Sequence, residues 1–212
     1  MNECVILLHG LNRNARSLSE IEQALTKAGF VTVNQDYPST RYCIEKLSQD
    51  TITRALLKCP KGGKVHFVTH SMGGILVRDY LHRYAIKNMG RVVMLGPPNK
   101  GSEVVDKLRR YPGFKILNGP AGMQLGTKEK SVPKRLGSVN FETGIIAGAH
   151  SINPILSTML PKPNDGKVSV ENTMINGMSD HLILPVTHPF MMNNRVVIEQ
   201  SIHFLKQGGF KK

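Results

Sequence analysis

The sequence has no tryptophan, only three cysteines and no long apolar segment. The three cysteines (Cys4, Cys43 and Cys59) do not suggest a disulfide framework, and their spacing matches no metal site. A single disulfide would still be compatible with an exported protein. No apolar run approaches the roughly 20 residues that a helix needs to cross a bilayer. We therefore expect a chain that folds around one apolar core, without a metal ion or a membrane-spanning helix.

The start of the sequence also lacks a leader. Met1 is followed almost at once by the strand-like run 4–8, with no basic segment, long apolar segment or cleavage site before it. This favours a cytoplasmic protein, or an exported one whose leader was removed before the numbering begins. The 212 residues are enough for one buried core and too few for two comfortable domains, so we expect a single domain over residues 1–212.

Acidic residues are scarce, since 15 Asp and Glu stand against 28 Lys and Arg, for a formal net charge of +13. This excess is compatible with an anionic partner such as a membrane surface, or simply with a solvated basic surface. The basic residues are spread along the chain, with some concentration between residues 100 and 135. Aromatic residues do not interleave with them as a nucleic-acid stacking surface requires, so no nucleic-acid partner is expected. The oligomeric state is left open.

Apolar, β-branched runs alternate with amphipathic stretches along most of the chain. Strands are predicted at 5–8, 30–33, 65–70, 91–95, 144–149 and 181–186. Helices are predicted from a capping box at Ser17–Glu20 to Gly29, and at 44–59, 75–81, 102–110 and 190–205. Because strand–helix–strand units form right-handed crossovers, this order predicts an α/β fold with a six-stranded, mainly parallel sheet and helices on both faces. Residues 100–142, which are basic and rich in Gly and Pro, are expected to form an irregular excursion over the carboxyl edge of the sheet.

The most informative stretch is residues 65–74, with the sequence VHFVTHSMGG. A buried strand, a serine on a tight turn and then a helix make the geometry of a nucleophile elbow, which exposes the serine hydroxyl. Gly73 leaves room for the strained turn at Ser71, and Gly74 lets the helix pack close to the strand. The usual Gly-x-Ser-x-Gly pattern has a glycine where this chain has Thr69. The alternative is an ordinary strand-to-helix turn that happens to contain Ser and Gly.

A serine nucleophile needs a base, and in a parallel sheet the active residues gather beyond the carboxyl ends of the strands. His188 follows the last predicted strand and is the expected base, with His150, after the fifth strand, as the main competitor. His181 lies at the start of the last strand and should be at the opposite edge. His82 and His203 fall within helices, and His66 lies within a strand.

The base in turn needs an acid to orient it. Asp165 lies on an Asp-Gly turn after the fifth strand, and the order Ser71, Asp165, His188 is the one expected for this kind of fold. A purely structural turn is the alternative interpretation of Asp165. Asp180 is the fallback acid, while Asp79 is expected to make a surface or capping contact.

The reaction also needs donors for a developing oxyanion. The Met72 amide, directly after the serine, is one candidate, and the Leu11 amide in the loop after the first strand is the other. His9 and Asn12 in the same loop are candidate substrate-binding residues, although His9 is better explained as a residue that fixes the loop.

Four segments carry a resemblance to the α/β-hydrolase superfamily, and within it to small bacterial lipase-like serine esterases. They are VILLHGLN at 5–12, VTHSMGG at 68–74, GPPNKGS at 96–102 and NDGKV at 164–168, and the likeness runs from Val5 to the last helix. The resemblance implies a Ser71–Asp165–His188 triad, an acyl-enzyme intermediate and no metal or cofactor. It also implies a minimal member that lacks the N-terminal strand pair of larger ones.

The sequence therefore predicts a carboxylic ester hydrolase, an esterase or lipase, acting on a small-molecule or lipid ester. The same triad could serve a thioesterase, an amidase or an acyltransferase. An interpretation from another class is a non-catalytic protein of this fold that binds an anionic surface. Acyl chain length and lid motion are not predicted.

Overall fold

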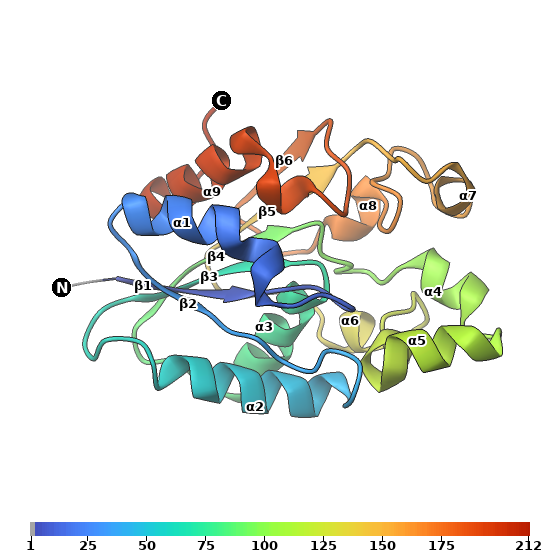
Figure 1. The fold of residues 1–212 in the computed structure, drawn as a ribbon, viewed down its shortest axis with the longest axis horizontal. Helices are drawn as coiled ribbons and strands as arrows, with labels where there is room; N and C mark the ends of the chain where they lie inside the picture. The colour runs from blue at the N-terminus through green and yellow to red at the C-terminus, as the bar shows by residue number, and fades with distance from the viewer. Residues whose placement is uncertain (1–2) are drawn as a thin grey trace.

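A six-stranded parallel sheet forms the centre of the computed structural model, which describes residues 3–212 (Figure 1). The strands are β1 (Cys4–Leu8), β2 (Val31–Asn34), β3 (Val65–His70), β4 (Met89–Leu95), β5 (Thr143–Gly148) and β6 (Asp180–Leu184). Their order is β2-β1-β3-β4-β5-β6, and every neighbouring pair is parallel. The predicted six-stranded sheet is confirmed.

Helices cover both faces of the sheet. α1 (Ser19–Lys27) and α9 (Arg195–Gln207) pack on one face, and α2 (Ile44–Leu56) and α3 (Met72–Arg83) pack on the other (Figure 1). Successive residues of a strand point to opposite faces. In β1, Val5 and Leu7 accordingly pack with α1 and α9, while Ile6 and Leu8 pack with α2 and α3. Burial on both faces explains why the central strands are apolar without alternation.

The helix after β1 does not begin at the predicted capping box. A 3-10 turn, η1 (Ala15–Leu18), precedes α1, and the side chain of Asn14 accepts a hydrogen bond from the Arg16 amide at 3.1 Å. The Ser17 hydroxyl instead donates to the Asn14 carbonyl. Because Asn14 starts the helical turn three residues earlier, the prediction of a Ser17 cap is wrong. The predicted end of this helix at Gly29 is confirmed by the positive φ of 97° at that residue.

The excursion after β4 is more helical than the sequence predicts. It contains α4 (Glu103–Leu108), α5 (Pro112–Met123) and α6 (Val132–Arg135), so the expectation of a single helix there is wrong. Pro112 suits the first turn of a helix, which needs no amide donor there. Inside α5, Gly119 has φ 60° and ψ −168°, so the chain kinks before Pro120. The Gly and Pro residues that suggest a loop are those of the helix start and of this kink.

Two further short helices, α7 (Pro154–Ser157) and α8 (Val170–Thr173), lie between β5 and β6, and the 3-10 turn η2 (Met191–Asn193) precedes α9. In Figure 1, α4, α5 and α7 lie at the same end of the molecule, away from the start of β1. None of the helices within residues 3–212 is both long and apolar enough to cross a membrane.

The excursion is tied to the sheet by a buried arginine of α3. Arg78 is only 3% exposed and donates hydrogen bonds to the backbone carbonyls of Asn99, Pro133 and Gly137 at 2.8–3.0 Å. Burial lowers the pKa of Arg78 to about 10, so it stays charged at neutral pH. The planar guanidinium can reach several carbonyl oxygens at once. One side chain therefore fixes both ends of the segment 99–137.

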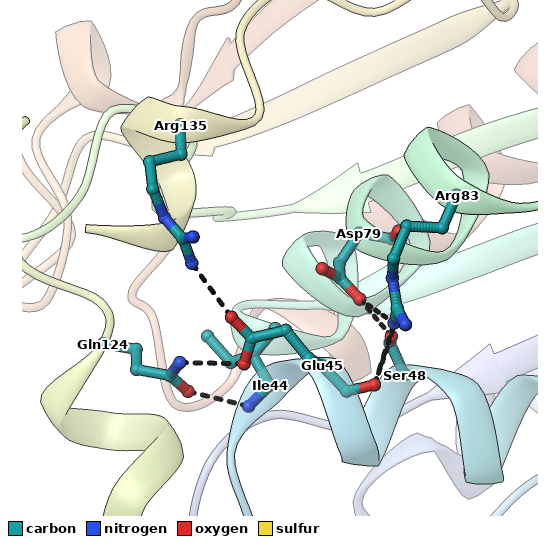
Figure 2. A network of polar contacts seen from close by, with 7 residues as sticks. All are labelled: Ile44, Glu45, Ser48, Asp79, Arg83, Gln124 and Arg135. Carbon is teal, nitrogen blue, oxygen red and sulfur yellow. Dashed lines mark hydrogen bonds and ion pairs between the residues drawn. The ribbon is translucent and has the colours of Figure 1, made fainter. Parts of the chain in front are cut away.

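A second network joins the excursion to α2 and α3 (Figure 2). The Gln124 side chain accepts a hydrogen bond from the Ile44 amide at 2.7 Å and donates one to Glu45 at 2.9 Å. Arg135 donates to the other carboxylate oxygen of Glu45 at 2.9 Å. The N-terminus of α2 is thus held by residues that follow α5 and end α6.

The same network corrects one expectation about an acidic residue. Asp79 is 4% exposed and accepts hydrogen bonds from Ser48 on α2 and from Arg83 on its own helix (Figure 2). Asp79 therefore makes neither a surface nor a capping contact. Its carboxylate is buried because α2 packs over α3, and it is paired with a cation there.

One disulfide joins Cys4 at the start of β1 to Cys59 after α2, and Cys43 is free. This is the single bridge that the cysteine count left open, and there is no larger disulfide framework among residues 3–212. The bridge closes a loop across 55 positions of the sequence.

Candidate active site

Ser71 occupies the turn between β3 and α3, in a backbone conformation that few L-residues adopt. Its φ is 53° and its ψ is −120°. Two hydrogen bonds hold the turn, since the Ser71 amide donates to the Leu95 carbonyl at 2.8 Å and the Gly74 amide donates to the Ser71 carbonyl at 3.1 Å. A non-glycine residue in such a region costs about 1–3 kcal/mol and persists where the surrounding structure enforces it, often at functional sites.

Glycines make this turn sterically feasible. A Cβ atom at Gly73 would lie 2.5 Å from the Leu8 carbonyl oxygen, so α3 can approach the end of β1 only because residue 73 has no side chain. A Cβ atom at Gly10 would lie 3.2 Å from the Cβ of Ser71. Thr69, which departs from the usual glycine, is fully buried, and its hydroxyl donates to the Val93 carbonyl of β4 at 3.4 Å. The larger residue is therefore accommodated within the sheet.

Asp165 and His188, which follow β5 and β6, contact each other directly. Nδ1 of His188 lies 2.7 Å from Oδ2 of Asp165, and both side chains are buried. The other oxygen, Oδ1, accepts hydrogen bonds from the Lys167 amide at 2.9 Å and the Val168 amide at 2.8 Å. The carboxylate is therefore fully engaged, and it holds the Nδ1 proton so that Nε2 of a neutral His188 carries the lone pair.

A cavity of about 350 Å³ brings Ser71, Asp165 and His188 together at the carboxyl ends of the strands. One wall comes from the loop after β1, with Leu11 and Asn12. Much of the remaining lining is apolar and belongs to segments outside the sheet: Val104, Val105, Phe114, Leu125, Ile152, Leu156 and Val168. The cavity thus combines the three candidate catalytic side chains with an apolar wall.

No protein-family model and no curated protein sequence matches this chain. Solved structures do match it. The mature form of the lipase BlEst2 of Bacillus licheniformis has 18% sequence identity and a TM-score of 0.67, with 94% of this chain and 88% of that chain covered. Phospholipase PlaB of Legionella pneumophila has 14% identity and a TM-score of 0.75, with 98% and 61% covered.

The metagenomic carboxyl esterase MGS0156 has 18% identity and a TM-score of 0.70, with 88% of this chain and 64% of that chain covered. The chain has the α/β-hydrolase fold. It spans 47% of the propeptide form of BlEst2 and less than two thirds of PlaB and MGS0156. At these identities the likeness establishes the fold, which agrees with the resemblance seen in the sequence motifs.

The competing residues lie elsewhere in the fold. His150 is exposed and does not line the cavity. Asp180 is the first residue of β6, where its carboxylate accepts hydrogen bonds from the His181 and Phe210 amides at 2.8 Å. It lies at the end of the strand opposite to Asp165, so the fallback acid is excluded by its position. Within residues 3–212, no three His, Cys, Asp or Glu side chains are grouped to hold a metal ion.

The candidate oxyanion donors flank Ser71. Met72 is the first residue of α3, so its amide is one of those that have no acceptor within the helix. Leu11 lines the cavity from the loop after β1. This loop passes beside Ser71 at Gly10, whose missing side chain permits the approach. The two amides that the sequence predicts as donors therefore belong to two segments that meet at the serine.

The two candidate substrate-binding residues of that loop have different positions. Asn12 lines the cavity and has a positive φ of 58°. His9 is fully buried and does not line the cavity. Its ring stacks on Tyr37 with centroids 4.1 Å apart, and its Nε2 lies 3.1 Å from Asp36. His9 fixes the loop, and it is not placed to touch a substrate.

Sequence reasoning missed His70, the residue before the serine. Its ring is buried beside that of His188, with centroids 4.8 Å apart, and its Nε2 lies 3.0 Å from the His188 carbonyl oxygen. Burial, and then the repulsion that a protonated His188 ring would exert, lower the pKa of His70 well below its ordinary value. The neutral ring must donate its Nε2 proton to the carbonyl, which holds the backbone of His188 in place. The adjacency of His70 to Ser71 was the signal that could have found it.

Proposed function

We propose that the chain is a carboxylic ester hydrolase in which Ser71 is the nucleophile, His188 the general base and Asp165 the orienting acid. The observation that carries the proposal is the 2.7 Å contact between Asp165 and His188 in a cavity that also contains the strained Ser71 turn. The lipase, the phospholipase and the carboxyl esterase among the structural neighbours support an ester as the substrate.

In this proposal Nε2 of His188 accepts the Ser71 proton as Oγ attacks the acyl carbon of the ester. The negative charge that develops on the carbonyl oxygen is stabilised by the Leu11 and Met72 amides. The tetrahedral intermediate expels the alcohol, which takes the proton from His188, and an acyl-enzyme remains. A water molecule deprotonated by the same His188 then attacks the acyl carbon. The second tetrahedral intermediate breaks its bond to Oγ, which takes the proton back from His188, and the acid is released. Asp165 stabilises the imidazolium during both steps.

The apolar wall of the cavity and its surroundings favour an ester with an apolar acyl chain. Phe114 and Leu156 line the cavity, while Ile116 and Ile155 on the same two helices are 82% and 70% exposed. An exposed apolar surface beside a cavity suits a substrate that is itself apolar.

Hydrolysis of short and long p-nitrophenyl esters by the wild type and Ser71→Ala tests this function. We expect Ser71→Ala to lose at least about a thousandfold in kcat/KM, in line with loss of a triad nucleophile. Ser19→Ala on α1, outside the cavity, should behave like the wild type. Equal activity of wild type and Ser71→Ala would remove Ser71 from the mechanism.

Thioesters, amides and acyl transfer to another acceptor remain alternatives with the same three residues, and a substrate panel separates them. A fluorophosphonate probe tests whether the protein is catalytic at all. Ser71 should be labelled covalently in the wild type and not in Ser71→Ala, whereas a non-catalytic protein of this fold would stay unlabelled in both.

A further inference from the structure

The cavity that contains Ser71 has a positive charge that the proposed ester hydrolysis does not use. Two cationic side chains, Arg13 and Lys167, are among the residues that line it. Asp165 is the sole acidic residue in that lining, and its carboxylate is already engaged by His188 and by two backbone amides. The charge of Arg13 and Lys167 is therefore not balanced from within the cavity.

Arg13 and Lys167 also lack acidic partners elsewhere. No carboxylate of residues 3–212 forms an ion pair with either of them. Both residues remain exposed, so a solute entering the cavity can reach them. Their exposure and their lack of ion pairs distinguish them from Arg78, which is buried and donates its hydrogen bonds to backbone carbonyls.

Each of the two cations is anchored next to one of the proposed catalytic residues. The Arg13 guanidinium donates a hydrogen bond to the Pro189 carbonyl at 3.2 Å, one residue after His188. The Lys167 backbone is held on both sides, because its amide donates to Asp165 and its carbonyl accepts the Ser102 hydroxyl at 2.7 Å. The Arg13 guanidinium, which comes from the loop after β1, is therefore held against the loop that carries His188. The Lys167 side chain starts from a fixed backbone on the loop that carries Asp165.

The two charges also act on each other. Partial enclosure of the ammonium group, and then the like charge of Arg13, lower the pKa of Lys167, against the opposing charge of Asp165. Arg13 also contributes to the lowered pKa of His70 beneath the site. Two like charges that repel each other in a cavity are stabilised by an anion bound between them.

We infer that Arg13 and Lys167 form an anion-binding subsite, and that the substrate is an ester that carries a phosphate or carboxylate group as well as its acyl chain. This inference rests on the proposed ester hydrolysis and names the substrate class of the same cavity. The anionic group can belong to the acyl part of the ester or to its alcohol part, and the two sources are distinguished by the substrates chosen below.

Two matched substrate pairs test the subsite. For the acyl side, p-nitrophenyl hydrogen glutarate is compared with neutral p-nitrophenyl valerate. For the alcohol side, 1-oleoyl lysophosphatidic acid is compared with 1-oleoylglycerol. In at least one pair the wild type should have the higher kcat/KM on the anionic ester. The ratio of kcat/KM on the anionic ester to kcat/KM on the neutral ester should fall about tenfold or more in Arg13→Gln/Lys167→Gln. Hydrogen bonds to charged groups contribute free energies on that scale.

The control is Lys27→Gln/Lys61→Gln, which removes two exposed positive charges away from the cavity and should leave the ratio unchanged. The subsite is refuted if the wild type has no preference for the anionic ester in either pair, or if the preference survives in Arg13→Gln/Lys167→Gln. A general effect of net charge would lower the ratio equally in the control, and this too would refute it.

A binding measurement separates failure of the subsite from failure of the proposed hydrolysis. Hexyl phosphate and 1-hexanol are titrated into Ser71→Ala by calorimetry, with and without Arg13→Gln/Lys167→Gln. We expect hexyl phosphate to bind the single variant about tenfold more tightly than the triple variant, with 1-hexanol unaffected. If no ester is hydrolysed but hexyl phosphate still binds in this way, the subsite stands without the esterase; equal binding by both variants refutes the subsite.

Discussion

Asp165 is held towards His188 by contacts that do not involve His188 itself. One carboxylate oxygen lies 2.7 Å from Nδ1 of His188, while the other accepts two backbone amides of its own turn, at 2.8 and 2.9 Å. The His188 amide in turn donates to the Asp165 carbonyl at 3.1 Å. The orientation of the carboxylate is therefore fixed by its own turn as well as by the imidazole.

We expect Asp165→Asn to lower kcat by about 10³–10⁴-fold, because an amide that donates towards Nδ1 would favour the wrong tautomer of His188. Ester hydrolysis and the rate of fluorophosphonate labelling measure this loss. Asp180→Asn, at the other end of β6, is the matched control and should stay close to the wild-type rate. Similar losses in both variants would contradict the assignment of Asp165.

His70 predicts how stability changes with pH. Because burial lowers its pKa in the folded state, the unfolded chain binds more protons below its ordinary pKa of about 6.5. The free energy of unfolding should therefore fall as pH drops from 7 to 5. His9, His66 and His181, whose pKa values are also lowered chiefly by burial, act in the same direction.

Urea unfolding at several pH values measures this dependence. The slope of the free energy of unfolding against pH, between pH 6 and 5, should be smaller in His70→Asn than in the wild type, by up to about 1.4 kcal/mol per pH unit. His150→Asn, which replaces an exposed histidine, is the control. An unchanged slope in His70→Asn would show that this ring does not stay neutral in the folded protein.

Gly73 predicts a steric effect on the turn at Ser71. A methyl group there would lie 2.5 Å from the Leu8 carbonyl oxygen, so Gly73→Ala must push α3 away from β1. We expect a loss of about 1–3 kcal/mol in the free energy of unfolding and a fall in the rate of the proposed ester hydrolysis. Gly113→Ala at the start of α5 meets nothing within 4 Å and should be close to neutral. Normal activity of Gly73→Ala would argue against a close approach at this point.

The contacts of Gln124 predict that this residue helps to attach the excursion after β4 to α2. Its side chain bonds both the Ile44 amide and Glu45, so Gln124→Ala leaves the N-terminus of α2 without this partner (Figure 2). The loss of stability should be about 1–2 kcal/mol, with faster amide hydrogen exchange in α5 and in the first turn of α2. Gln23→Ala, exposed on α1, should change neither quantity. Unaltered exchange in α5 would show that other contacts suffice to hold it.

The disulfide between Cys4 and Cys59 predicts an effect of reduction. Opening a loop across 55 positions should lower the free energy of unfolding by about 2–4 kcal/mol, largely by freeing the unfolded chain. Denaturation of Cys59→Ser with and without reductant measures it. Cys43→Ser removes the free cysteine and should retain the response to reductant. If reductant does not change the free energy of unfolding of the wild type, the disulfide between Cys4 and Cys59 is contradicted.

The strand and helix order and the positions of Ser71, Asp165 and His188 could be read from the sequence because each depends on local patterns. Short apolar runs rich in β-branched residues favour strands, and parallel connections place every loop that follows a strand at one edge of the sheet. Ser71 directly follows β3, His188 comes shortly after β6, and Asp165 lies in the long connection that leaves the carboxyl end of β5. Their common location at one edge of the sheet follows from this connectivity.

Other features depended on contacts between residues far apart in the chain, which no local pattern encodes. Examples are the Arg13–Pro189 hydrogen bond, the burial of Asp79 beneath α2, the contact of His70 with His188, and the attachment of the excursion by Arg78. Gly and Pro residues also led to the wrong prediction of irregular structure in α5, where they belong to a helix start and a kink. Packing in three dimensions decides which side chains become partners. The location of Arg13 and Lys167 in the lining of one cavity is therefore a property of the folded chain and of no local pattern.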